Sequence, residues 1–140
     1  MSDAPVRRLM TVAAAALIDG EGRVMLTPRP EGKPMAGLWE FPGGKLEPGE
    51  SPEDALVREL AEELAITVRP ENLQPLTFAS HGYETFHLLM PLYVCREWEG
   101  TPTSCEGQAI HMVRPEDMDS YDIPAADVPL VRHIQTVFSR

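Results

Sequence analysis

The chain has 140 residues, 43% hydrophobic and 24% charged, a composition typical of a globular protein rather than a disordered or fibrous one. Its 22 acidic residues outnumber its 12 basic ones, and the formal net charge of −10 argues against a broad basic face for duplex nucleic acid. No apolar run approaches the roughly 20 residues of a membrane span. We therefore expect one domain over residues 1–140, monomeric or homodimeric, with no nucleic-acid or membrane partner.

The N-terminal segment predicts a β-hairpin. Residues 10–18 are apolar, residues 19–22 form a turn rich in Gly and Asp, and residues 23–28 return as a second strand. A signal peptide is the competing interpretation, because two arginines precede the ten-residue apolar run. Asp3 and the continuation "IDGEGRVML" favour the hairpin. The two cysteines show no Cys-x-x-Cys spacing, which is typical of a reduced, cytoplasmic protein.

The middle of the chain predicts a loop followed by a helix. Residues 29–38 carry two prolines and two glycines and are expected to be a loop, with "WEF" a short extended piece after it. Ser51 is a typical N-cap, Pro52 suits the first helical position, and Glu53 and Asp54 suit the first turn. The helix is expected to run from residue 52 to about residue 64.

The C-terminal half predicts three strands and a second helix. Residues 73–100 contain two strands around a turn at 81–84, and "GQAIHMVRP" contains another. Residues 125–139 have helical apolar spacing. The expected fold class is α/β (α+β), with a mixed central β-sheet and two main helices.

The first predicted helix carries an acidic face. Glu59, Glu62 and Glu63 fall within roughly a 100° arc of its surface, and its apolar residues occupy another arc. Carboxylates at this spacing repel one another unless they converge on hard divalent cations. The alternative is a solvated face on which Arg58 pairs with Glu62.

The surrounding spacing resembles the Nudix box, G-x5-E-x7-R-E-U-x-E-E-x-G-U, in which U is apolar. The matching residues are Gly44, Glu50, Arg58, Glu59, Leu60, Glu62, Glu63 and Ile66. Only Ala65 departs, where the family has glycine, and a non-glycine residue at positive φ costs about 1 kcal/mol. "TPRPEGKPMAGLWEFPGGK", "REWEG", "EGQ" and "IPAADVPL" resemble the MutT branch of this family, which implies the Nudix fold, an α/β/α sandwich.

The resemblance implies a Mg²⁺ or Mn²⁺ cofactor. It places the metal ligands at Gly43, Glu59, Glu62, Glu63 and Glu106. Arg58 is expected to orient a carboxylate through paired hydrogen bonds. Glu59, Glu106 or the metal alone is the candidate for deprotonating the attacking water, and the sequence leaves this choice open.

The resemblance also implies a nucleoside triphosphate substrate. Arg29 and Lys45 are candidates for phosphate contact, although each is also interpretable as a surface charge. Phe41, Trp39 and Phe78 are candidate stacking surfaces.

Asp127 corresponds to an asparagine that faces the base in relatives that act on oxidised guanine. An ionised aspartate suits the N1–H and N2 edge of guanine, and a protonated one also reaches O6. The alternative for Asp127 is a first-turn aspartate of the last helix.

The expected function is metal-dependent hydrolysis of a nucleoside triphosphate to the monophosphate and pyrophosphate, with 8-oxo-dGTP as the first candidate substrate. The same chemistry on a cytidine or methylated pyrimidine triphosphate, or on an ADP-ribose-type dinucleotide, is the enzymatic alternative. A non-catalytic nucleotide-binding Nudix module is the alternative from another class, although every box glutamate is present.

Overall fold

A computed structural model describes residues 7–105, 107 and 109–138 of the chain. Its larger sheet is mixed and has the strand order β4-β1-β6-β5. The central strand β1 pairs in parallel with β6 on one side and antiparallel with β4 on the other, and β5 pairs antiparallel with β6. The strands are β1 (Arg8–Leu17), β4 (Gly43–Lys45), β5 (Gln74–Gly82) and β6 (Phe86–Cys95).

The predicted N-terminal hairpin is wrong in its pairing, although its turn and both strands are present. The Asp19 carboxylate accepts hydrogen bonds from the backbone N–H groups of Glu21 and Arg23, each at 2.9 Å, which closes the turn. Strand β2 (Val24–Pro28) then leaves β1 after a single bridge between Ile18 and Val24.

Strand β2 instead forms a second sheet with order β3-β2-β7, together with β3 (Trp39–Glu40) and β7 (His111–Val113). The physical reason is that both edges of β1 are already occupied, one by β4 and the other by β6.

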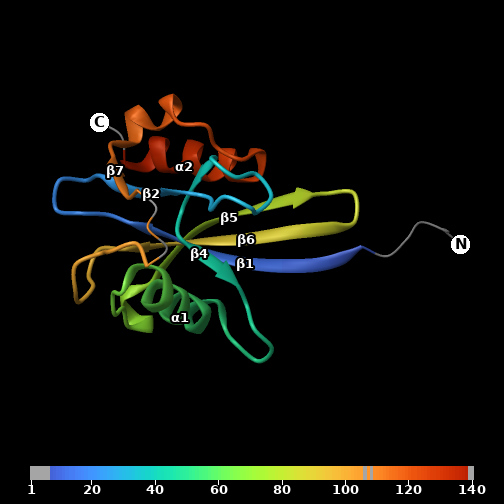
Figure 1. The fold of residues 1–140 in the computed structure, drawn as a ribbon, viewed down its shortest axis with the longest axis horizontal. Coiled ribbons are helices and arrows are strands. Elements are labelled where there is room, and N and C mark those ends of the chain that lie inside the picture. Colours follow the sequence, from blue (N-terminus) through green and yellow to red (C-terminus); the bar gives the residue numbers. More distant parts are fainter. Residues whose placement is uncertain (1–6, 106, 108, 139–140) are drawn as a thin grey trace, which may run out of the picture.

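Two helices cover opposite faces of the larger sheet (Figure 1). Helix α1 (Pro52–Leu64) has the predicted bounds, and the Ser51 hydroxyl caps it by accepting the Asp54 N–H at 3.1 Å. Ala65 ends it in the left-handed conformation, with φ of 57°. Helix α2 (Val128–Phe138) begins three residues later than predicted, because the 3-10 turn η3 (Ala125–Asp127) precedes it. Two further 3-10 turns are η1 (Pro70–Asn72) and η2 (Pro115–Ser120).

Strand β1 separates two hydrophobic cores. Its side chains alternate between them: Ala13, Ala15 and Leu17 pack with the apolar face of α1, and Ala14 and Ala16 pack with α2. The small alanine side chains let both helices approach the sheet closely. The predicted mixed sheet between two helices is therefore confirmed. None of the helices in the described part of the chain is long and apolar enough to cross a membrane.

Candidate active site

One cavity of about 810 Å³ contains most of the side chains that the sequence singled out. The loop after β2, strand β4, one face of α1 and the turn η3 all contribute to its lining. The predicted site residues among its lining are Arg29, Phe41, Gly43, Lys45, Glu59, Glu63 and Asp127. The lining does not include Arg58 or Glu62, and Glu106 lies outside the described residues.

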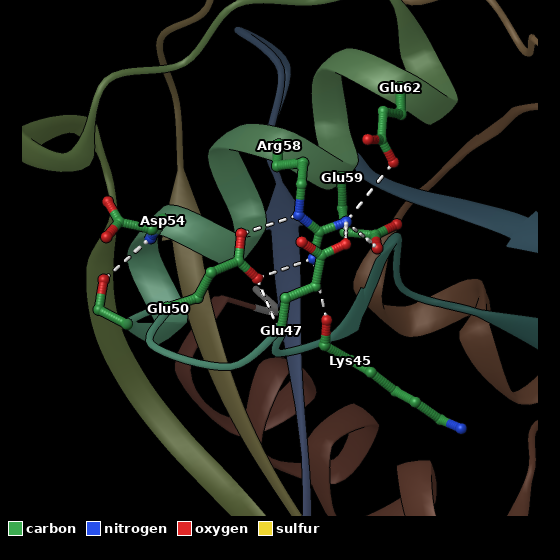
Figure 2. A network of polar contacts seen from close by, with 8 residues as sticks. Lys45, Glu47, Glu50, Asp54, Arg58, Glu59 and Glu62 are labelled. Carbon is green, nitrogen blue, oxygen red and sulfur yellow. Dashed lines mark hydrogen bonds and ion pairs between the residues drawn. The ribbon is translucent and has the colours of Figure 1, made fainter.

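Arg58 is the centre of the polar network beside this cavity (Figure 2). Its Nε and Nη2 donate to the two carboxylate oxygens of Glu50, both at 2.8 Å, which is a bidentate pair. Its Nη1 donates to Glu59 Oε1 at 2.8 Å, and Nη2 also donates to the Lys45 carbonyl at 3.0 Å. Arg58 therefore joins the loop before α1 to the carboxylate that faces the cavity.

Glu50 braces the loop that leads into α1. Its Oε1 accepts the backbone N–H of Glu47 at 2.7 Å in addition to the Arg58 fork. The hydrogen bond from Arg58, followed by the one from the Glu47 N–H, lowers the pKa of Glu50 to about 2. The paired carboxylates in turn raise the pKa of Arg58. Glu50 and Arg58 are therefore both ionised near neutral pH.

The glycine pair explains how close the glutamate helix lies to β4. A Cβ atom on Gly44 would lie 2.4 Å from Glu59 Cδ, and one on Gly43 would collide with the Ala13 carbonyl oxygen. Gly43 has a φ of 152°, which side chains rarely allow. Gly44 therefore lets the Glu59 carboxylate rest against the β4 backbone at the cavity wall, and Gly43 lets β4 lie close to β1.

The donor set at this end of the cavity fits a hard divalent cation in part. Glu59 and Glu63 line the cavity beside Gly43 and offer the oxygen ligands that Mg²⁺ prefers. The Glu62 side chain is 62% exposed and lies 3.5 Å from Arg58 Nη1. Across residues 7–105, 107 and 109–138, no three His, Cys, Asp or Glu side chains are gathered as a ready-made metal cage. The roles of Gly43, Glu59, Glu62, Glu63 and Glu106 as ligands remain predictions.

The segment before Glu106 is held against the end of α1. The Thr103 N–H donates to the Leu64 carbonyl and the Cys105 N–H donates to the Glu63 carbonyl, both at 2.9 Å. These bonds satisfy carbonyls that a helix C-terminus leaves without partners. Ser104, between them, lines the cavity.

The other end of the cavity is acidic and largely buried. Asp127 is only 6% exposed, and burial, followed by the charge of Glu40, raises its pKa to about 7. Burial also raises the pKa of Glu40, against the opposing effect of Arg29. Near neutral pH, Asp127 thus exists as a mixture of the neutral acid, which donates one hydrogen bond, and the carboxylate, which donates none.

Arg29 is already paired at this end. Its Nη1 donates to Glu40 Oε2 at 2.8 Å and its Nε donates to the Pro34 carbonyl at 2.8 Å. Lys45 has its ammonium pointing away from the Arg58 network in Figure 2, and it also lines the cavity. Contact of either cation with phosphate stays a prediction.

Two of the three stacking candidates lie outside the cavity. The Trp39 ring packs against His111 at 4.3 Å and Tyr121 at 5.1 Å between ring centroids, and Phe78 is 63% exposed on β5. Phe41 lines the cavity, although it is 4% exposed.

Glu40 and Tyr83 are among the cavity residues that the sequence analysis did not single out. A signal was available for Glu40, because a carboxylate between two aromatic residues in a short strand predicts a buried charge that needs a partner. Tyr83 gave no such signal, because it lies in a turn whose position in the fold depends on distant pairing.

Comparisons with known proteins agree with this geometry. The family model described as the NUDIX domain matches residues 13–133. The chain belongs to the Nudix family. The match covers the cavity-lining strands, α1 and the turn that carries Asp127, so the family assignment and the site rest on the same residues.

This Nudix chain is similar to two relatives and a solved structure over most of its length. It is 39% identical to the CTP pyrophosphohydrolase of Escherichia coli K12, over 87% of this chain and 89% of that one. It is 34% identical to the 8-oxo-dGTP diphosphatase of Haemophilus influenzae, over 91% and 93%. A solved MutT structure, from work on Aliivibrio salmonicida and Vibrio cholerae, superposes with a TM-score of 0.79 at 32% identity, covering 94% and 100%.

These matches confirm the predicted resemblance to MutT-like Nudix proteins. They also confirm that the chain is an enzyme, a Nudix pyrophosphohydrolase, rather than a non-catalytic module.

Proposed function

We propose that this Nudix hydrolase is a Mg²⁺-dependent nucleoside triphosphate pyrophosphohydrolase and that oxidised guanine nucleotides are its substrates. The observation that carries the proposal is one cavity lined both by Glu59, Glu63 and Lys45, from α1 and β4, and by Asp127, from the turn before α2. Helices α1 and α2 cover opposite faces of the larger sheet (Figure 1), and we call these two parts of the lining the phosphate end and the base end. An elongated ligand with phosphates at one end and a hydrogen-bonding ring at the other matches this distribution. In the cytoplasmic nucleotide pool, hydrolysis of 8-oxo-dGTP prevents its incorporation into DNA.

The phosphate end requires a cation because the protein is anionic. A nucleoside triphosphate brings about four negative charges to a chain whose formal net charge is −10. Bound Mg²⁺ supplies charge neutralisation, polarises phosphoryl oxygens and lowers the pKa of coordinated water. Glu59, Glu62, Glu63, Glu106 and the Gly43 carbonyl are the groups proposed to hold it.

The protein's own groups position the reaction. Arg58 fixes the Glu59 carboxylate through the 2.8 Å hydrogen bond, and Glu50 fixes Arg58 in turn. Glu59 or Glu106 accepts the proton of the attacking water. Lys45 binds phosphate oxygens from the cavity wall. The products are the nucleoside monophosphate and pyrophosphate, with attack at the β-phosphorus as in MutT-like enzymes.

The base end favours guanine by its balance of donors and acceptors. Guanine presents two donors, N1–H and the N2 amino group, beside one acceptor, O6, whereas cytosine presents one amino donor beside two acceptors. Asp127 and Glu40 do not offer more donors than acceptors in any protonation state, because a carboxylate donates none and a neutral carboxyl group donates one hydrogen bond beside its carbonyl acceptor. This count supports a guanine nucleotide, and the 8-oxo-dGTP relative supports its oxidised form.

Cytidine triphosphates are the second candidate. They are favoured by the relative named CTP pyrophosphohydrolase, which is 39% identical. A neutral Asp127 can donate to cytosine N3 and accept from its amino group, so Asp127 in that protonation state can recognise cytosine through two hydrogen bonds.

A panel of triphosphates with and without Mg²⁺ tests the proposal, with pyrophosphate release as the measurement. We expect the highest kcat/KM for 8-oxo-dGTP and no turnover without a divalent cation. A higher kcat/KM for CTP or a methylated dCTP would refute oxidised guanine nucleotides as the preferred substrates and favour cytidine triphosphates.

The variant Glu62→Gln tests the metal assignment. We expect kcat to fall at least about 100-fold, because a glutamine offers no negative charge to the cation. The matched control is Glu71→Gln, which removes one exposed carboxylate from η1, outside the box and outside the cavity lining. An unchanged kcat in Glu62→Gln would refute the role of Glu62.

A further inference from the structure

Tyr83 is held rigidly at the base end of the cavity. It follows β5 in the turn that leads to β6, and its backbone N–H donates to the Phe86 carbonyl at 2.8 Å. Its ring is stacked on the Phe86 ring, with 4.7 Å between centroids and 20° between planes. The His81 ring meets it edge-on at 4.8 Å. Two aromatic neighbours therefore fix the direction of the phenol.

The phenol lies within electrostatic reach of Asp127. Both residues line the same cavity, together with Phe86. Burial raises the pKa of Tyr83, and the negative charge of Asp127 raises it further while Arg29 lowers it. The titratable and charged groups that face this end are Asp127 from η3, Glu40 from β3, Arg29 and Lys33 from the loop after β2, and His81 from β5.

Tyr83 offers the base end a hydrogen-bond donor that does not depend on pH. The guanidinium of Arg29 is held in place by its hydrogen bonds to Glu40 and to the Pro34 carbonyl. Asp127 offers an O–H only while it is neutral. A phenol with a raised pKa remains a donor throughout the range in which Asp127 ionises.

We propose that Tyr83 is a specificity-determining residue whose hydroxyl donates to a carbonyl oxygen of the base while Asp127 accepts the neighbouring ring N–H. This inference rests on the proposed function, because it requires a nucleotide in the cavity with its base beside Asp127. Guanine provides that pair of atoms as O6 and N1–H. Adenine has no carbonyl oxygen, so its nucleotides gain nothing from the hydroxyl.

The variant Tyr83→Phe tests the hydroxyl alone, since it keeps the ring that stacks on Phe86. At pH 8, we expect kcat/KM for 8-oxo-dGTP to fall about fivefold through KM, which corresponds to about 1 kcal/mol. At pH 6, where neutral Asp127 supplies a donor, we expect a fall of about twofold or less. For dATP, we expect no change at either pH. Tyr121→Phe is the matched control, because that hydroxyl pairs with His111 Nδ1 at 2.8 Å and Tyr121 does not line the cavity.

Two further variants identify the group whose titration makes the effect of Tyr83→Phe depend on pH. In an Asp127→Asn background, the amide donates at every pH, so Tyr83→Phe is expected to have the same small effect at pH 6 and pH 8. In a His81→Gln background, the difference between pH 6 and pH 8 is expected to persist. Its loss there would assign the titration to the His81 ring and overturn the pairing with Asp127.

Binding of 8-oxo-dGMP, measured by calorimetry without metal, separates this inference from the proposed function. We expect Tyr83→Phe to weaken binding about fivefold at pH 8, with an unchanged Tm. Equal losses for 8-oxo-dGTP and dATP, or no loss at pH 8, would overturn the role of Tyr83 while leaving the hydrolysis itself in place. A wild-type protein that hydrolyses no triphosphate would instead refute the proposed function.

Discussion

Replacing Asp127 with asparagine should change how the stability of the fold depends on pH. Asp127 is 6% exposed, and its pKa is raised from 3.8 to about 7, mainly by burial and then by Glu40. Because the folded-state pKa lies above the unfolded one, the folded state binds the extra proton between these values. The contribution of Asp127 to the free energy of unfolding is fully present below about pH 4 and is lost as the pH rises to about 7. Asparagine keeps the shape and removes the titration.

The size of the effect follows from the shift. A shift from 3.8 to about 7 corresponds to about 4 kcal/mol at about 1.4 kcal/mol per pKa unit, reached in full only above pH 7. The part that develops between pH 6 and pH 8 is about 1.4 kcal/mol by the same linkage relation. We therefore expect the free energy of unfolding of Asp127→Asn to gain about 1.4 kcal/mol on the wild type between these two pH values.

Urea denaturation of both proteins at pH 6, 7 and 8 measures this difference directly. Asp117→Asn is the control, because Asp117 is exposed in η2 and its hydrogen bonds in the structure involve its backbone. It should follow the wild-type curve. If the free energy of unfolding depended on pH in the same way for Asp127→Asn and wild type, burial would not raise the pKa of Asp127 in the protein. Neutral Asp127 would then not be available to donate to the base near neutral pH.

Two further predictions concern α1 and its neighbours. Gly44→Ala places a methyl group 2.4 Å from Glu59 Cδ, so Glu59 must leave its hydrogen bond to Arg58. We expect kcat/KM to fall about 100-fold and the Mg²⁺ concentration for half-maximal rate to rise. The circular dichroism spectrum of this variant is expected to stay near that of the wild type. Wild-type kinetics in this variant would exclude a need for the close approach. Ala65→Gly relieves the positive φ of 57° and is expected to raise the free energy of unfolding by about 1 kcal/mol, measured in urea; a loss of stability would argue against a left-handed helix end.

Local features of the chain were sufficient to predict α1 and its acidic face. Ser51, Pro52 and the acidic first turn act within a few residues of one another, so the start of the helix follows from its own sequence. The spacing of Glu59 and Glu63 places both on one face for the same reason. Even the single departure from the family pattern, Ala65, is found at positive φ as the pattern requires.

Pairing between distant segments required the tertiary structure. Nothing near Asp19 shows that β1 is already paired on both edges, so the hairpin was predicted where two sheets diverge. Arg58 was expected to orient a carboxylate, and its principal partner is Glu50, eight residues earlier, with Glu62 more distant at 3.5 Å. A side chain that can reach several carboxylates is placed by the loop geometry rather than by helical spacing.

The sequence alone is sufficient to predict the part of the cavity proposed to bind phosphate: the glycines, the capped helix and the glutamates on one of its faces. Those features depend on backbone geometry over one or two helical turns, which residue type and spacing control directly. Of the residues at the base end, the sequence singled out Asp127, and folding brings Glu40 and Tyr83 to the same cavity from two distant segments. The raised pKa of Asp127 and the rigid Tyr83 ring depend on burial and on neighbours brought together by folding, because desolvation is a property of the assembled cavity rather than of any segment.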